Sequence, residues 1–168
     1  LNVLTCEPEW EALINELGGQ HVTAKSATTA FQDPHFVEAR PSLIAKARHA
    51  DLLICTGAEL EIGWLPLLLR QSGNANIQIN ELGYFLVSDF VSHIEKPKVL
   101  DRSHGDIHSQ GNPHVHWGPY RVLTIAKALS QRLVKLDPEH TDFYTQQLTK
   151  FTASWKSNII RWEKTTSH

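Results

Sequence analysis

The run Asp51-Leu52-Leu53-Ile54-Cys55 decides the fold that this sequence predicts. Every position after the aspartate is apolar, and Gly57 follows as a natural stop. A strand without polar positions is typical of a parallel sheet that helices cover on both faces. Further strand patterns occur at residues 3–6, 21–25 and 76–79, so the sequence predicts a sheet of four strands.

Helical patterns alternate with these strands. Apolar residues at helical spacing predict helices at residues 8–17, 43–49 and 61–70, and, after an irregular segment at 81–111, a helix at 119–136. A last helix of about 25 residues is predicted from Asp137-Pro138 onward. The alternation predicts an α/β fold: a four-stranded parallel sheet flanked by helices, flavodoxin-like in its order 2-1-3-4, ending in the long helix.

Composition limits the classes of function. The chain has 168 residues, enough for one domain, and its 16 basic residues nearly balance 18 acidic ones. A nucleic-acid partner would require a clustered basic excess, so we expect none. No stretch approaches the roughly 18 apolar residues of a membrane span.

Two cysteines, Cys6 and Cys55, end the first and third predicted strands. Those strands are neighbours in the order 2-1-3-4, so both sulfurs would lie at one edge of the sheet. A disulfide and a pair of buried free thiols both fit this arrangement.

Histidine is the unusual residue type, with ten in the chain. The densest group is Asn112-Pro113-His114-Val115-His116. In an extended segment His114 and His116 point to the same face, where two imidazoles can share one zinc ion. The alternative is a surface loop that is rich in histidine by chance. His104 and His108, in the preceding polar segment, are either auxiliary ligands or solvated side chains.

A second motif of the same form, Asp33-Pro34-His35, stands in the loop after the second strand. Ligands of parallel α/β sheets bind beyond the carboxyl ends of the strands, which is where the loops at 26–40 and 56–60 should lie. Proline stiffens the backbone just before the imidazole. Glu59 and Glu61 follow the third strand, where they could complete a site, hold a ligand's N–H, or simply favour a helix N-terminus.

These motifs, in this order, resemble the zinc- and manganese-specific substrate-binding proteins of bacterial ABC importers. The resemblance rests on Asp33-Pro34-His35 before Arg40-Pro41-Ser42, the 50–54 strand with Gly57 and Glu61 after it, Asn112-Pro113-His114, and Leu136-Asp137-Pro138-Glu139. It covers most of the chain.

The resemblance implies two α/β lobes joined by a rigid helix, with the metal held between them. Residues 1–136 would form the N-terminal lobe and 137–168 the linking helix, with the C-terminal lobe absent from this chain. His35 and His114 would be this lobe's ligands. His116 departs from the family pattern as an extra or substitute ligand. Imidazoles without a firmly placed carboxylate favour Zn²⁺ over Mn²⁺.

The expected function is therefore capture of zinc outside the cytoplasm, in the periplasm or its equivalent, for an ABC permease in the membrane, without catalysis. Two other functions remain open from the residues. A metal chaperone or storage protein would use the segment from His104 to His116 and would not need His35. A zinc hydrolase would use the His-x-His pair with an open coordination position.

Overall fold

The computed structural model describes residues 1–91 and 117–166. Its main elements, in chain order, are β1 (Asn2–Thr5), α1 (Pro8–Gly18), β2 (Thr23–Ser26), α2 (Pro41–Arg48), β3 (Leu52–Cys55), α3 (Leu65–Ser72), β4 (Tyr84–Leu86), α6 (Pro119–Leu136) and α7 (Thr141–Thr166). The four strands are all parallel, in the order β2-β1-β3-β4. The predicted sheet, its order and the final long helix are confirmed. No helix among the described residues is both long and apolar enough to cross a membrane.

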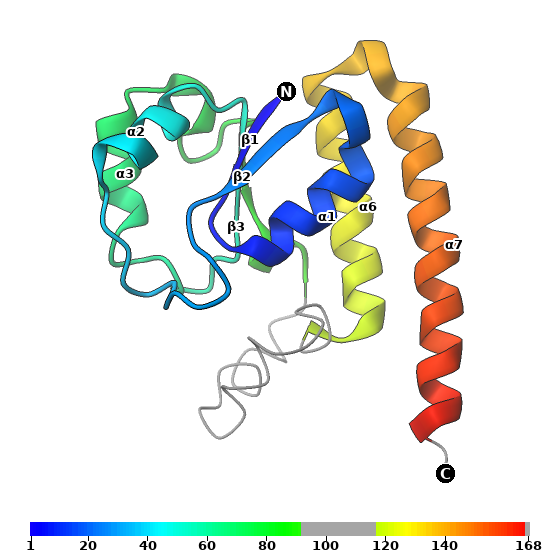
Figure 1. Cartoon of the computed structure of the whole chain (residues 1–168). Helices are drawn as coiled ribbons and strands as arrows, with labels where there is room; N and C mark the ends of the chain where they lie inside the picture. Colours follow the sequence, from blue (N-terminus) through cyan, green and yellow to red (C-terminus); the bar gives the residue numbers. More distant parts are fainter. Residues whose placement is uncertain (92–116, 167–168) are drawn as a thin grey trace.

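Helices lie on both faces of the sheet, with α2 and α3 on one side and α1, α6 and α7 on the other (Figure 1). Successive strand residues point alternately into the two layers. Leu52 and Ile54 pack towards α1 and α6, whereas Leu53 and Cys55 pack towards α2 and α3. All of β3 is buried, which explains why its sequence has no polar position.

Proline marks where helices begin. Pro8, Pro41 and Pro119 each occupy the first position of α1, α2 and α6. That position has no intrahelical partner for its N–H, and proline's fixed φ suits the first turn. The prediction that a helix runs from Glu61 through Pro66 is wrong for the same reason: α3 begins at Leu65, so Pro66 lies in its first turn.

The fourth strand is not where the sequence pattern placed it. Residues 76–79 do not form a strand; Ala75–Ile77 is a 3-10 turn, and β4 lies within the segment predicted to be irregular. Asn74 explains the turn, because its side chain accepts from the Asn76 amide at 3.0 Å and donates to the carbonyls of Ala47 and Ala50. The second strand is also shifted, since His21 ends a 3-10 turn before β2.

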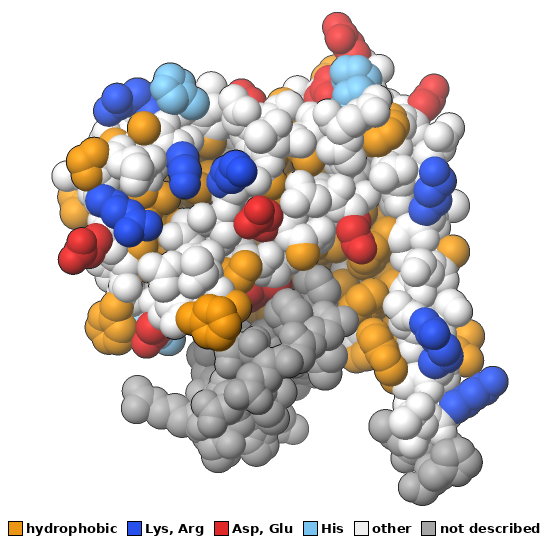
Figure 2. Space-filling model, in the orientation of Figure 1, with side chains coloured by type: hydrophobic (Ala, Val, Ile, Leu, Met, Phe, Trp, Pro, Cys, Tyr) orange, Lys and Arg blue, Asp and Glu red, His pale blue; other side chains and the backbone are white. Residues whose placement is uncertain are grey.

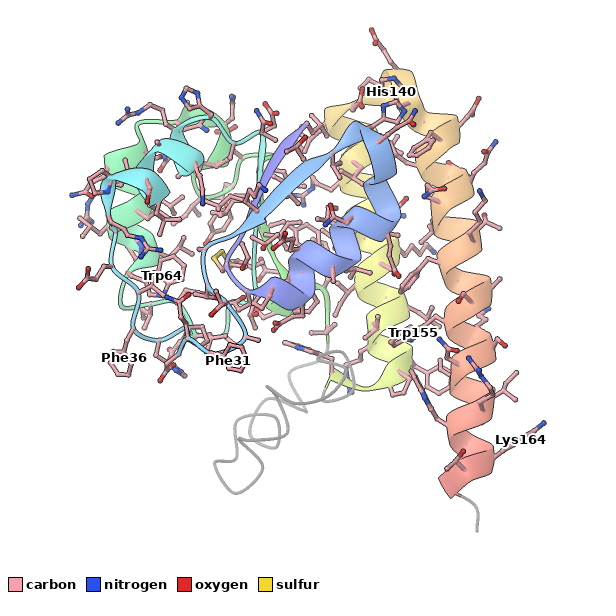
Figure 3. All side chains as sticks on the ribbon, viewed as in Figure 1. Phe31, Phe36, Trp64, His140, Trp155 and Lys164 are labelled. Atoms are coloured by element: carbon pink, nitrogen blue, oxygen red, sulfur yellow. A yellow bond between two sulfur atoms is a disulfide. The ribbon has the colours of Figure 1, made fainter. Side chains whose placement is uncertain are left out.

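The long helix α7 packs along α6 and α1. Figure 2 shows hydrophobic side chains along the seam between α6 and α7. Trp155, labelled in Figure 3, is buried there and donates its indole N–H to the Pro119 carbonyl at 2.6 Å.

The corner before α7 is held by side chains. The Asp137 carboxylate accepts from the Tyr144 hydroxyl at 2.6 Å and lies 2.8 Å from Nδ1 of His140. The Tyr144 hydrogen bond, together with His140, lowers the pKa of Asp137. Asp137 therefore precedes the turn before α7, as its position suggested, but bonds side chains and not backbone amides.

A substitution at Gly83, directly before β4, tests the pairing of β3 with β4. A Cβ at this position would lie 2.3 Å from the Asn76 carbonyl oxygen and 2.6 Å from that of Asp51, both backbone atoms that cannot move cheaply. We expect Gly83→Ala to lower the free energy of unfolding by at least about 3 kcal/mol, measured by urea denaturation.

Gly73→Ala is the matched control. Gly73 has a left-handed backbone, with φ +61°, but nothing lies within 4 Å of its missing Cβ. Its substitution should cost only about 1 kcal/mol, the penalty of a left-handed backbone. Equal losses in the two variants would contradict the close approach at Gly83.

Candidate metal centre

The carboxyl edge of the sheet gathers the loops that carry the candidate ligands. β1, β2 and β3 all end there, and backbone hydrogen bonds continue past the strands: Ala27 N–H donates to Thr5 O, and Cys6 N–H to Ile54 O. The loop at residues 27–40 leaves β2, and the loop at 56–64 leaves β3.

His35 lies in the first of these loops with its ring orientation fixed. Oδ1 of Asp33 accepts from the His35 backbone N–H at 2.9 Å and lies 2.8 Å from ring Nδ1. Because a carboxylate only accepts, Nδ1–H is the donor in this contact, and in the neutral ring the lone pair then lies on Nε2. The side chain is about half exposed, at 51%. A carboxylate behind an imidazole in this way is the usual support of a metal-ligating histidine.

Trp64 anchors the same loop to α3. Its indole N–H donates to the Pro34 carbonyl at 2.6 Å while its ring is buried. Phe31 and Phe36, on either side of the motif, are 92% and 82% exposed, and Figure 3 shows both at the outer side of the loop. The loop is thus fixed at its centre and presents apolar groups outward.

The two carboxylates after β3 have different surroundings. Glu61 is buried, and its two oxygens accept from the amides of Thr56 and Gly57, each at 3.0 Å. Glu59 is exposed, and its φ is positive at 70°. The φ of its neighbour Ala58 is also positive, at 51°. Such backbone costs about 1–3 kcal/mol per residue and persists only where surrounding contacts impose it. Glu61 supplies that contact by bonding to the start of the loop.

Glu7 is a buried acid that the sequence reasoning missed. It is 3% exposed, and Oε1 accepts from the Thr56 hydroxyl at 2.7 Å and the Thr56 amide at 3.2 Å. Burial, followed by its hydrogen bond with Glu61, raises the pKa of Glu7 well above its ordinary value. The available signal was its position, directly after an apolar strand at the edge where ligands bind.

Cys6 and Cys55 form a disulfide next to these acids, with their Cα atoms 4.8 Å apart (Figure 3). Both residues are completely buried. The bond joins the ends of β1 and β3, so it fixes the two loop origins relative to each other.

The other predicted histidine ligands, His104, His108, His114 and His116, lie outside the described residues. The structure therefore places His35 at the carboxyl edge of the sheet and buries Glu61 in the loop that follows β3. The second Pro-His motif stays a prediction from the sequence.

Comparison with known proteins places this arrangement in a family. The model of the zinc-uptake complex component A periplasmic family, ZnuA, matches residues 3–167. The chain belongs to the ZnuA family. Members of this group are metal-binding substrate-binding proteins of ABC transporters.

Two relatives of this ZnuA-family chain are lipoproteins. This chain is 27% identical over 155 residues to the manganese ABC transporter substrate-binding lipoprotein PsaA of Streptococcus pneumoniae. It is 26% identical over 155 residues to the metal ABC transporter substrate-binding lipoprotein FimA of Streptococcus parasanguinis. Each match covers 90% of this chain and 47% of the relative. The chain thus spans about half the length of the curated relatives it matches.

Solved structures share the fold. A zinc-bound ZnuA deletion mutant superposes with a TM-score of 0.70 at 22% identity, covering 94% of this chain and 55% of that one. The Mn-bound periplasmic metal binding protein of Candidatus Liberibacter asiaticus gives 0.71 at 19% identity, with 95% and 55% covered.

Glu7 predicts a specific pH dependence. Its raised pKa means that the folded protein keeps a proton which the unfolded chain releases above about pH 4.5, the ordinary value. Above this pH the unfolded chain binds fewer protons than the folded protein. The contribution of Glu7 therefore lowers the free energy of unfolding as pH rises. Glu7→Gln, whose amide can still donate to Glu61, removes the effect.

We therefore expect the stability of Glu7→Gln relative to the parent chain to increase as the pH rises above 4.5, measured by urea denaturation at each pH. Glu139→Gln, which removes an exposed acid, is the control for the change of charge. A Glu7→Gln difference independent of pH would show that Glu7 ionises normally.

Proposed function

We propose that this chain captures zinc outside the cytoplasm and serves an ABC importer, with His35 as one ligand. The observation that carries the proposal is the contact between Asp33 and His35, which orients the ring and leaves Nε2 as its other nitrogen, in a half-exposed side chain at the sheet edge where α/β proteins bind ligands.

The second ligand in this proposal is His114. Its motif repeats the form of the first, a short polar residue, proline and histidine, and it follows β4 in the chain as Asp33-Pro34-His35 follows β2. His116 is a substitute or additional ligand, while His104 and His108 are auxiliary. Glu61 acts as a support that fixes the loop after β3, since both of its oxygens already accept backbone amides.

The proposed organisation is one lobe and one linker. Residues 1–136 form the N-terminal lobe, and residues 137–168 the helix that leads to a second lobe outside this chain. The chain's span of about half the length of its relatives supports this division. The second lobe would supply the remaining ligands, and the loaded form would dock on the membrane permease.

Zinc is the proposed cargo because the described loop offers imidazole. Imidazole nitrogen suits zinc, whereas carboxylate and carbonyl oxygens suit manganese. Relatives and similar structures include a manganese ABC transporter lipoprotein, a zinc-bound protein and a manganese-bound protein, so the choice rests on the chemistry of this chain's own residues. A location outside the cytoplasm is supported by the lipoprotein relatives and by the disulfide, which persists in oxidising compartments.

Zinc titration of the metal-free chain by calorimetry tests the proposal. We expect one ion per chain, and a loss of affinity of at least about tenfold in His35→Ala and in His114→Ala, since each removes a nitrogen that would bind the ion directly. His49→Ala is the control: this exposed histidine ends α2, at the opposite edge of the sheet, and should have no effect. Full-strength binding without His35 would assign the ion to the segment from His104 to His116 and favour storage over transport.

Asp33 provides a finer test of the same site. Asp33→Asn keeps the shape of the side chain but removes the carboxylate that holds Nδ1–H. Loss of such a support costs about 10–100-fold in metal affinity in known sites. We expect a weaker zinc affinity in that range with the stoichiometry unchanged, whereas equal affinity would mean that the ring orientation does not matter for binding.

A further inference from the structure

A second group of metal-binding atoms lies at the ends of β1 and β3. Sγ of Cys6, Sγ of Cys55 and a carboxylate oxygen of Glu61 all lie within 4.8 Å of one another, and all three residues are buried. While the two sulfurs are joined to each other, neither is a thiolate, so the oxidised protein has no ligand set here.

We propose that Cys6, Cys55 and Glu61 form a second metal site, for a thiophilic divalent ion such as zinc, when a dithiol reduces the disulfide. Ligand atoms around a tetrahedral zinc lie about 3.5–4 Å apart, given zinc–sulfur bonds near 2.3 Å and zinc–oxygen bonds near 2.0 Å. The Glu61 oxygen lies no more than 4.8 Å from either sulfur, and once reduction breaks the bond between the sulfurs, side-chain rotation can separate them to that spacing.

The reaction balances with the dithiol as the only reductant. The dithiol gives two electrons to the Cys6–Cys55 bond, its own sulfurs join in a cyclic disulfide, and its two protons pass to the cysteines. The ion then displaces both thiol protons to solvent as the two thiolates and the Glu61 carboxylate bind it. Water fills the fourth position.

The surroundings of Glu61 fit a ligand role. The amides of Thr56 and Gly57 hold one oxygen each, which orients the carboxylate while each oxygen retains a further lone pair. Glu7 lies beside it, and no donor among the described residues reaches Oε2 of Glu7.

Cadmium binding to the whole chain tests the proposal, because cadmium bound to thiolate gives an ultraviolet charge-transfer band. The chain is reduced with an immobilised dithiol, which is removed before anaerobic titration. We expect the reduced chain to bind one more cadmium than the oxidised chain, with the thiolate band only in the reduced form. The band should survive in His35→Ala, which separates this site from the proposed transport site.

Two variants identify the ligands. Cys55→Ser should abolish the band, and Glu61→Gln should weaken cadmium binding by at least about tenfold with the band retained. Near-ultraviolet circular dichroism, reporting on buried Trp10 and Trp64, follows the fold in each sample. The proposal is overturned if the reduced chain gives no thiolate band, if Cys55→Ser keeps it, or if reduction alone abolishes the folded signal.

Discussion

Burial of β3 on both faces is the constraint on which the rest of the structure depends. Its four residues alternate between two hydrophobic layers, and each fully buried aliphatic side chain contributes about 1.5–3 kcal/mol of transfer free energy. A strand with two such faces must lie inside a sheet with helices on both sides. β1 and β4 pair with it directly, and the loop that leaves it is the one that Glu61 holds.

The fold could be predicted because most of its determinants are local patterns. Apolar runs and helical spacing identified the strand order and the long final helix. β4 could not be located in this way: Ile77 is apolar and buried, yet the side chain of Asn74 holds its neighbours in a 3-10 turn. The start of α3 was missed because Pro66 suits the first turn of a helix, which places that start at Leu65 and not at Glu61.

The candidate site could be predicted only in part from the sequence, because some of its charged groups are contiguous and others come from separate parts of the chain. Asp33-Pro34-His35 is contiguous, so its supporting carboxylate and candidate ligand appear together in the sequence. The acid pair is not: Glu7 and Glu61 are 54 residues apart and meet only because β1 and β3 are neighbours. Their shared partner, Thr56, becomes apparent only when the strand ends are placed together.

The same contacts decide which ligand atoms the described part of the lobe offers to a metal. Asp33 is occupied by His35, Glu61 by two amides, and Glu7 by Thr56. At the loop that carries His35, these carboxyl groups therefore support protein structure, and the atom left for an incoming ion is an imidazole nitrogen. Any carboxylate ligand beside His35 would come from elsewhere in the protein, so the contribution of this loop to metal choice favours ions that prefer nitrogen.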